Sequence, residues 1–330
     1  MSAPLLLAGH GTRDQAGVAA FTALTARVGA LLRGEGVEVA GGNIELSAPP
    51  LRAAVAGLAA RGHRQVVAVP LVLSAAAHAK GDIPAALARE RRRHPGLAWR
   101  YGRPLGPHPA LLELLAARVN AVLARGDDPP SPPRGIARGD DPRGIARGDC
   151  ENVDGPDASD GTTEQAAVLL VARGSTDPDA NAEVCKTSRL LWEGRRLMFT
   201  ETAFVSLARP SVAEGLERCR RLGARRIVVA RYFLFPGVLP ERVAEQACRY
   251  ADTHPDIDIR CSGVLGDCDP IANLVAERYR EALSGDIRMN CDVCIYRTAL
   301  PGFEHRVGAP QRPHDHPHDH FPDGGHVHVR

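Results

Sequence analysis

Two stretches decide the fold: LLLAGHGTRDQ at residues 5–15 and AVLLVARGSTDPD at residues 167–179. Each is a short apolar run that ends in a basic or imidazole side chain next to glycine. Three further pairs follow in the same order: SAPPLRAAVAGL (47–58) with LARPSVAEGL (207–216), RQVVAVPLVLSAAAHAKGDI (64–83) with RRIVVARYFLFPGVLPERV (225–243), and HPGLAWRYGRPLGPHP (94–109) with HPDIDIRCSGVLGDCDP (254–270). The offset stays at 160–163 residues. A constant offset indicates an internal duplication of units of roughly 120 residues.

Each unit alternates apolar runs with helical patterns. In the first half, strands are expected at residues 4–8, 37–46, 66–73 and 97–101, with helical periodicity at 16–32 and 50–60. Strands that alternate with helices favour parallel, right-handed βαβ units. We therefore predict an α/β fold of two duplicated lobes, each a four-stranded, mainly parallel sheet flanked by helices, followed by an irregular C-terminal tail.

A composition break separates the two halves. Residues 125–165 are rich in Pro, Gly, Asp and Arg, and RGIARGD occurs there twice, at 134–140 and 143–149. Such a stretch cannot bury a core, and its alternating Asp and Arg argue against a basic tract that binds an acidic partner. The predicted division is a first lobe at 1–125, a flexible linker at 126–165, a second lobe at 166–285 and a tail at 286–330.

Composition excludes several function classes. The formal net charge of the 330 residues is only +2, whereas a nucleic-acid-binding protein usually shows a clear basic excess. We find no run of about 18 apolar residues and no signal-peptide pattern at the start, so we expect a cytoplasmic protein without a membrane segment. Its eight cysteines are then expected as thiols or metal ligands. A monomer and a homodimer both stay open.

Three candidate catalytic residues follow three strands of the first half. His10 comes directly after the first strand, Glu45 closes the second, and His78 lies in the small-residue loop after the third. In open parallel sheets ligands bind beyond the carboxyl ends of the strands. Imidazole nitrogen and carboxylate oxygen suit a divalent cation such as Co²⁺, Fe²⁺, Ni²⁺ or Zn²⁺, and they also suit proton transfer.

Each of these residues has a simpler interpretation when taken alone. His10 fits a hydrogen-bonding loop residue, Glu45 a solvated charge at a strand end, and His78 a cap for the helix that begins near Asp82. Their equivalent depth on one sheet edge favours a shared site.

These residues carry a resemblance to a known family. Gly9–Arg13 (GHGTR), residues 44–46 with Pro49, and the stretch from Pro70 through His78 to Pro84 resemble the sirohydrochlorin chelatases, which are class II tetrapyrrole chelatases. The two units, a Cys-x-x-Cys segment and a His-rich tail resemble the long, cobalt-inserting form that serves anaerobic cobalamin synthesis.

The resemblance implies that a divalent metal enters sirohydrochlorin and two pyrrolic protons leave. His10 and His78 would hold the metal or accept protons, with Glu45 as base or ligand. The substrate's carboxylates would be bound by side chains near the same rim and by backbone amides of the Ser74–Ala77 loop; the candidates are Arg13, Arg52, Ser74, Lys80 and Arg173. No ATP is implied, and the sequence has no GxxxxGK[ST] phosphate loop.

The second half departs from this pattern. Arg173 stands at the position of His10, Leu239 at that of His78, and Thr202 or Ala203 at that of Glu45. We therefore expect the active site in the first lobe, with the second lobe either closing the cleft or purely structural.

The C-terminal segment predicts separate metal chemistry. Cys291 and Cys294 form a CxxC, which suits zinc or, as the resemblance implies, an iron–sulfur cluster. Six imidazoles follow, which predict a loosely binding metal-delivery tail: His314, His316, His318, His320, His326 and His328. Cobalt is the expected substrate metal, iron for sirohaem is the runner-up, and a non-catalytic metal storage or delivery protein is the alternative from another class.

Overall fold

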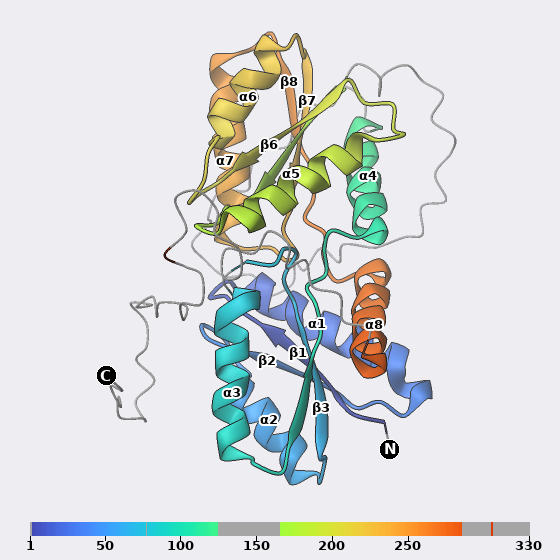
Figure 1. Ribbon diagram of the computed structural model, residues 1–330. Coiled ribbons are helices and arrows are strands. Elements are labelled where there is room, and N and C mark those ends of the chain that lie inside the picture. The colour runs from blue at the N-terminus through green and yellow to red at the C-terminus, as the bar shows by residue number, and fades with distance from the viewer. Residues whose placement is uncertain (1, 77, 125–165, 286–304, 306–330) are drawn as a thin grey trace, which may run out of the picture. The chain divides into compact units, whose positions relative to one another are not determined.

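The computed structural model describes residues 2–76, 78–124, 166–285 and 305. The predicted linker and nearly all of the predicted tail therefore lie outside the described residues. The first sheet contains four strands in the order β2-β1-β3-β4, and all of its neighbouring strands are parallel (Figure 1). Its strands are β1 (Leu5–Gly9), β2 (Val39–Asn43), β3 (Gln65–Pro70) and β4 (Ala98–Tyr101).

The second sheet repeats the first. Its order, β6-β5-β7-β8, is the same with each strand shifted by one unit of the duplication, and its neighbours are again parallel. The strands are β5 (Ala166–Ala172), β6 (Phe199–Phe204), β7 (Arg226–Arg231) and β8 (Asp258–Cys261). The predicted duplicated α/β fold is thus confirmed.

Helices cover both sheets. In the first half α1 (Gln15–Leu32) begins at the N-cap Asp14, whose side chain accepts a hydrogen bond from Gly17 N at 3.0 Å. The remaining helices that stay with their own half are α2 (Leu51–Ala60), the π-helical η2 (His78–Asp82), α3 (Ile83–Arg93), α5 (Pro178–Trp192), α6 (Val212–Arg221) and α7 (Val238–Thr253), and the short η1 (Arg33–Glu35) follows α1.

The apolar stripe of α1 lies in the core. Phe21, Leu24, Val28 and Leu32 follow helical spacing and are buried in the same cluster as strand residues of β1 and β3. By length and composition alone, Gln15–Glu35 is the one candidate membrane span among the described residues. Its packing against the sheet accounts for that apolar composition.

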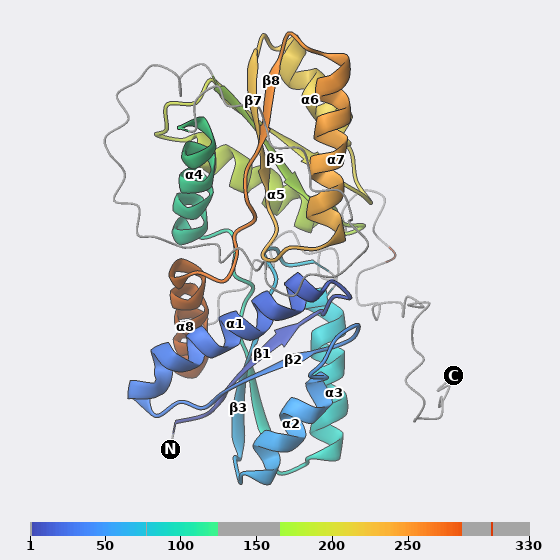
Figure 2. The same ribbon diagram turned by 180° about the vertical axis from the view of Figure 1, so that it is seen from behind.

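The last helix of each half crosses to the other sheet. Helix α4 (Pro109–Leu123) packs on α5 and β7, whereas α8 (Asp269–Ser284) packs on α1 and β3 (Figures 1 and 2). The described residues of both halves accordingly belong to one compact unit. The sequence repeats are therefore not the packing units, because each sheet is covered by one helix from the other repeat.

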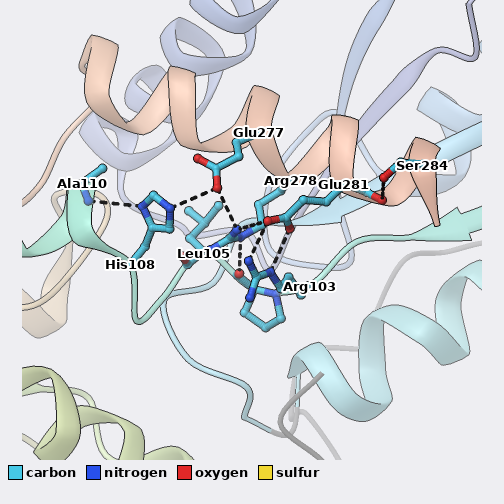
Figure 3. A network of polar contacts seen from close by, with 9 residues as sticks. Arg103, Leu105, His108, Ala110, Glu277, Arg278, Glu281 and Ser284 are labelled. Atoms are coloured by element: carbon cyan, nitrogen blue, oxygen red, sulfur yellow. Dashed lines mark hydrogen bonds and ion pairs between the residues drawn. The ribbon is translucent and has the colours of Figure 1, made fainter. Parts of the chain in front are cut away.

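On each of the two crossing helices, α4 and α8, one arginine donates hydrogen bonds to backbone carbonyls of the other repeat. The buried Arg278 of α8 donates from Nε to the carbonyl of Pro104 and from Nη2 to that of Leu105, both at 3.0 Å, and Nη1 lies 2.8 Å from Glu281 (Figure 3). The half-buried Arg118 of α4 stands at the repeat-equivalent position and donates to the carbonyl of Leu265 at 3.1 Å. Both copies of the duplicated unit therefore use an arginine at this position to hold the crossing helix.

Candidate active site

The end of β1 places His10 against the loop after β2. Strand β1 lies between β2 and β3, and His10 follows its last residue. Gly11 adopts a φ of 97°, and a Cβ there would lie 1.9 Å from the carbonyl oxygen of Glu45. Only glycine allows this approach, because both the conformation and the space exclude a side chain. The backbone of Glu45 then donates to the carbonyl of His10 at 3.1 Å.

His10 and Glu45 form a close side-chain pair. Nε2 of His10 lies 2.7 Å from Oε1 of Glu45, and both side chains are largely buried. On the other side of the ring, Nδ1 lies 3.3 Å from the carbonyl oxygen of Gly11. A carbonyl can only accept, so this contact assigns a hydrogen to Nδ1. Nε2 therefore faces Oε1 of Glu45 at ion-pair distance.

Arg173 brings a cation from the second half to the same place. The charges of Glu45 and Asp82 act on its guanidinium, so the three residues share one electrostatic environment. Burial lowers the pKa of Arg173 and the two carboxylates oppose that shift. The side chain keeps part of its surface exposed. A guanidinium stays protonated near neutral pH, so it supplies a fixed positive charge.

Backbone hydrogen bonds identify the residue of the second half that is equivalent to Glu45, and it differs from the one that the sequence alignment gave. Ser206 donates its N–H to the carbonyl of Arg173 at 3.0 Å, as Glu45 does to His10. Strand pairing gives the same register, because Ala172 pairs with Phe204 and Gly9 with Asn43. Ser206 is therefore the equivalent of Glu45, and the assignment of Thr202 or Ala203 was wrong. The second half lacks a carboxylate at this position.

The third predicted residue, His78, is placed by its backbone only. It is the first residue of η2, and its side chain lies outside the described part of the structure. Of the predicted trio, the structure thus brings together His10 and Glu45. Among the described residues, no group of three His, Cys, Asp or Glu side chains forms a metal site.

Lys80 has a different role from the predicted one. Its Nζ lies 2.8 Å from Oδ2 of Asp177 and 2.9 Å from Oδ2 of Asp179, and its side chain is only 7% exposed. The ion pairs raise the pKa of Lys80 although burial acts to lower it. A lysine held in this way is not a rim donor for substrate carboxylates.

One backbone amide of the Ser74–Ala77 loop departs from its predicted role. Ser74 is half-buried, and its carbonyl accepts from the N–H of Ala76. The amide of Ala75 donates to Oε2 of Glu183 at 2.7 Å. That amide is therefore engaged within the protein and does not face a substrate.

Arg13 and Arg52 lie where the sequence placed them. Arg13 is in the loop between β1 and α1, and Arg52 is the second residue of α2, after β2. Both side chains are exposed. Because both follow parallel strands, they lie at the carboxyl edge of the first sheet.

Sequence reasoning missed three buried carboxylates. Asp177, Asp179 and Glu183 are all less than a tenth exposed and lie at the start of α5. Burial raises the pKa of Glu183 to about 7. The N-cap pattern Asp-Pro-Asp signalled a helix start, but nothing in the sequence shows that Lys80 neutralises these charges.

Two surface hollows lie in the second half, around α6 and between α5 and β6, and are lined by arginines such as Arg209 and Arg218. These cations are paired, as in the 2.9 Å contact of Arg218 with Glu201. The sheet edge at His10 offers the better chemistry because it combines imidazole, carboxylate and guanidinium.

The C-terminal candidates lie outside the described residues. The iron–sulfur or zinc assignment of Cys291 and Cys294 and the delivery role of the six tail histidines stay predictions.

Comparison with known proteins supports the sequence resemblance. The CbiX family model matches residues 4–122 and 167–282. The chain is 33% identical over 257 residues to the sirohydrochlorin cobaltochelatase of Priestia megaterium, covering 78% of this chain and 73% of that protein. It is 25% identical over 241 residues to the sirohydrochlorin ferrochelatase of the same organism, covering 73% and 76%. The structure of SirB from Bacillus subtilis with Fe³⁺ has the same fold, with a TM-score of 0.64 at 23% identity, and covers 88% of this chain and 100% of that one.

Proposed function

Because the chain belongs to the CbiX family and is a metal chelatase, we propose that it inserts Co²⁺ into sirohydrochlorin and releases two protons. The observation that carries the proposal is the His10–Glu45 pair at the carboxyl edge of the first sheet. Metal insertion needs a donor that holds the cation and a base that takes the pyrrolic protons. The pair supplies both functions within 2.7 Å.

Protonation sets the order of events at His10. A cation can bind Nε2 only after any proton on that nitrogen has left. Glu45 is placed to receive that proton and to pass it to solvent through its partly exposed carboxylate. After the cation has moved to the macrocycle, the freed pair accepts a proton from a pyrrole nitrogen. His78 is proposed as the second ligand or base.

The positive groups at this edge fit the acidic substrate. Sirohydrochlorin carries several carboxylates, and Arg13, Arg52 and Arg173 are proposed to bind them. Arg173 is the strongest candidate because its charge already acts on Glu45 and Asp82. A substrate carboxylate that pairs with Arg173 would lie beside the metal-binding pair.

Cobalt is preferred to iron on the similarity to the relative that inserts cobalt. The cobaltochelatase of Priestia megaterium is 33% identical, whereas the ferrochelatase of that organism is 25% identical. Ligand chemistry alone does not separate the two metals. Iron insertion for sirohaem is therefore the second candidate. We place the enzyme in the cytoplasm.

An anaerobic absorbance assay tests the proposal. Sirohydrochlorin is mixed with the full-length protein and either Co²⁺ or Fe²⁺, and His10→Ala serves as the matched variant. We expect a spectral change faster than the uncatalysed reaction, faster with Co²⁺ and lost in the variant. Metal uptake without acceleration by the wild type would reject the chelatase and favour the storage or delivery protein.

A further inference from the structure

One helix of the second half contacts both ends of the segment that carries His78. Oε2 of Glu183 accepts from the N–H of Ala75 at 2.7 Å. Asp177 and Asp179 contact Nζ of Lys80 at 2.8 and 2.9 Å. Ala75 precedes His78 by three residues and Lys80 follows it by two. We refer to Asp177, Asp179 and Glu183 as the α5 carboxylates.

The α5 carboxylates are held in place by the turn that starts their helix. Asp177 is the N-cap, and its Oδ1 accepts from the N–H of Asp179 at 3.1 Å while its Oδ2 contacts Lys80. The side chain of Ser175 accepts from the N–H of Asp177 at 3.0 Å, and Asn181 accepts from the N–H of Ser175 at 2.9 Å. These bonds orient the side chain of Asp177 toward Lys80, and the side chain of Asp179 contacts the same ammonium group.

A contribution to the free energy of unfolding does not account for this arrangement. Removing two aspartates and a lysine from water costs about as much as their attraction returns, so a buried ion pair is weak evidence for stabilisation. Its better-attested use is to fix one geometry among several. Here the two points that it fixes are Ala75 and Lys80, which flank His78.

The other repeat lacks this clamp. Asp14 is the N-cap of α1 as Asp177 is that of α5, so Ala16 and Ala20 stand where α5 has Asp179 and Glu183. In the facing segment, Glu241 stands at the position of Lys80 and Leu239 at that of His78. The clamp therefore acts only on the segment that contains an imidazole.

We propose that the α5 carboxylates are positioning residues for metal insertion. They fix the backbone on both sides of His78, and so determine how this residue meets the cation held by His10. The half that lacks both catalytic imidazoles thus supplies the support for the imidazole at position 78 of the other half. This inference rests on the proposed function, because it assigns His78 to the metal.

The test uses the full-length Asp177→Asn/Asp179→Asn variant in steady-state assays with Co²⁺ and sirohydrochlorin varied separately. We expect the KM for Co²⁺ to rise about tenfold or more, as is usual when a group that orients a metal ligand is removed, and kcat to fall. The KM for sirohydrochlorin should stay within about twofold, since the arginines assigned to it are intact. A merely structural role would lower the active fraction and leave both KM values unchanged.

Glu281→Gln is the matched control. Glu281 pairs at 2.8 Å with the buried Arg278 and with Nε of Arg103, so it also joins the two halves, but it lies on α8. We expect this variant to keep the wild-type KM for Co²⁺. In a His78→Ala background, the two asparagine substitutions should add no further rise in that KM, because residues that act through one another are not additive.

Three results would overturn the inference: an unchanged KM for Co²⁺ in the double variant, an equal rise in Glu281→Gln, or a fully additive effect in the His78→Ala background. If the wild type itself shows no insertion, the proposed function fails instead. Hydrogen exchange of residues 75–80 then tests the clamp alone. Faster exchange in the double variant supports it, and unchanged exchange refutes it.

Discussion

Glu183 should make the protein less stable as the pH rises, and Glu183→Gln should remove this effect. In the unfolded chain a glutamic acid loses its proton near pH 4.5, whereas burial raises the pKa of Glu183 to about 7 in the folded protein. Between these values the folded state binds more protons than the unfolded state. Stability therefore falls through this window and levels off above it.

The magnitude follows from the two pKa values. A tenfold change in proton affinity corresponds to ~1.4 kcal/mol, so the gap between 4.5 and about 7 is worth about 3 kcal/mol. The side-chain amide introduced by Glu183→Gln keeps an oxygen that can accept from Ala75, but it carries no charge to desolvate. The variant should therefore gain up to about 3 kcal/mol on the wild type at pH 8 and little or nothing at pH 4.5.

Urea unfolding of both proteins at several values between pH 4.5 and 8 measures the difference. Glu281→Gln gives a control of opposite sign. Burial would raise the pKa of Glu281, but hydrogen bonds from Arg103 and Arg278 lower it. Loss of that carboxylate should therefore cost the same from about pH 5 to 8 and less as the pH falls below 4.5. If the difference between wild type and Glu183→Gln does not change with pH, the burial argument for Glu183 is refuted.

Three further outcomes are expected. Gly11→Ala should abolish metal insertion, because the added Cβ would lie 1.9 Å from the carbonyl oxygen of Glu45. Gly62→Ala is the control: Gly62 also has a positive φ, but the space around it is open, so this variant should retain activity in the same assay. Arg278→Met should lower the free energy of unfolding by about 2–4 kcal/mol in urea titrations, since two buried carbonyls lose their donor; no change would show that water replaces it. Truncation after Arg312 should slow insertion at scarce Co²⁺ and leave the rate at saturating Co²⁺ unchanged, and equal rates at both concentrations would exclude a delivery role.

The sheets were predictable, but the exchange of helices was not. Central strands that are buried on both faces appear in the sequence as continuous apolar runs, such as Leu5–Gly9. The constant offset between the repeats indicated two such sheets. The apolar faces of α4 and α8 are predictable as well. An amphipathic pattern, however, indicates only that one face of a helix is buried. It does not indicate which sheet covers that face. Because both repeats carry the same pattern, either sheet would satisfy it.

The site was predictable where local geometry decided it. His10, directly after a buried strand, was placed correctly at the sheet edge, and Gly11 beside it allows the close approach of the Glu45 carbonyl. The assignment of Lys80 was wrong because its partner Asp177 lies 97 residues away in the chain. The register of Glu45 was misread in the second half, because Ser206 carries no carboxylate that would mark the equivalent position in the sequence.

The duplication explains why a half without the two catalytic imidazoles is still needed. Each repeat has one loop at its sheet edge and one helix start that contacts the loop of the other repeat. In the first repeat the loop carries His78 and the helix start carries Ala16 and Ala20. In the second repeat the loop carries Leu239 and the helix start carries Asp179 and Glu183. The polar residues of both repeats therefore meet at one of the two equivalent contacts. A single repeat would lack either the donor or its support, so separate expression of the halves should yield no chelatase.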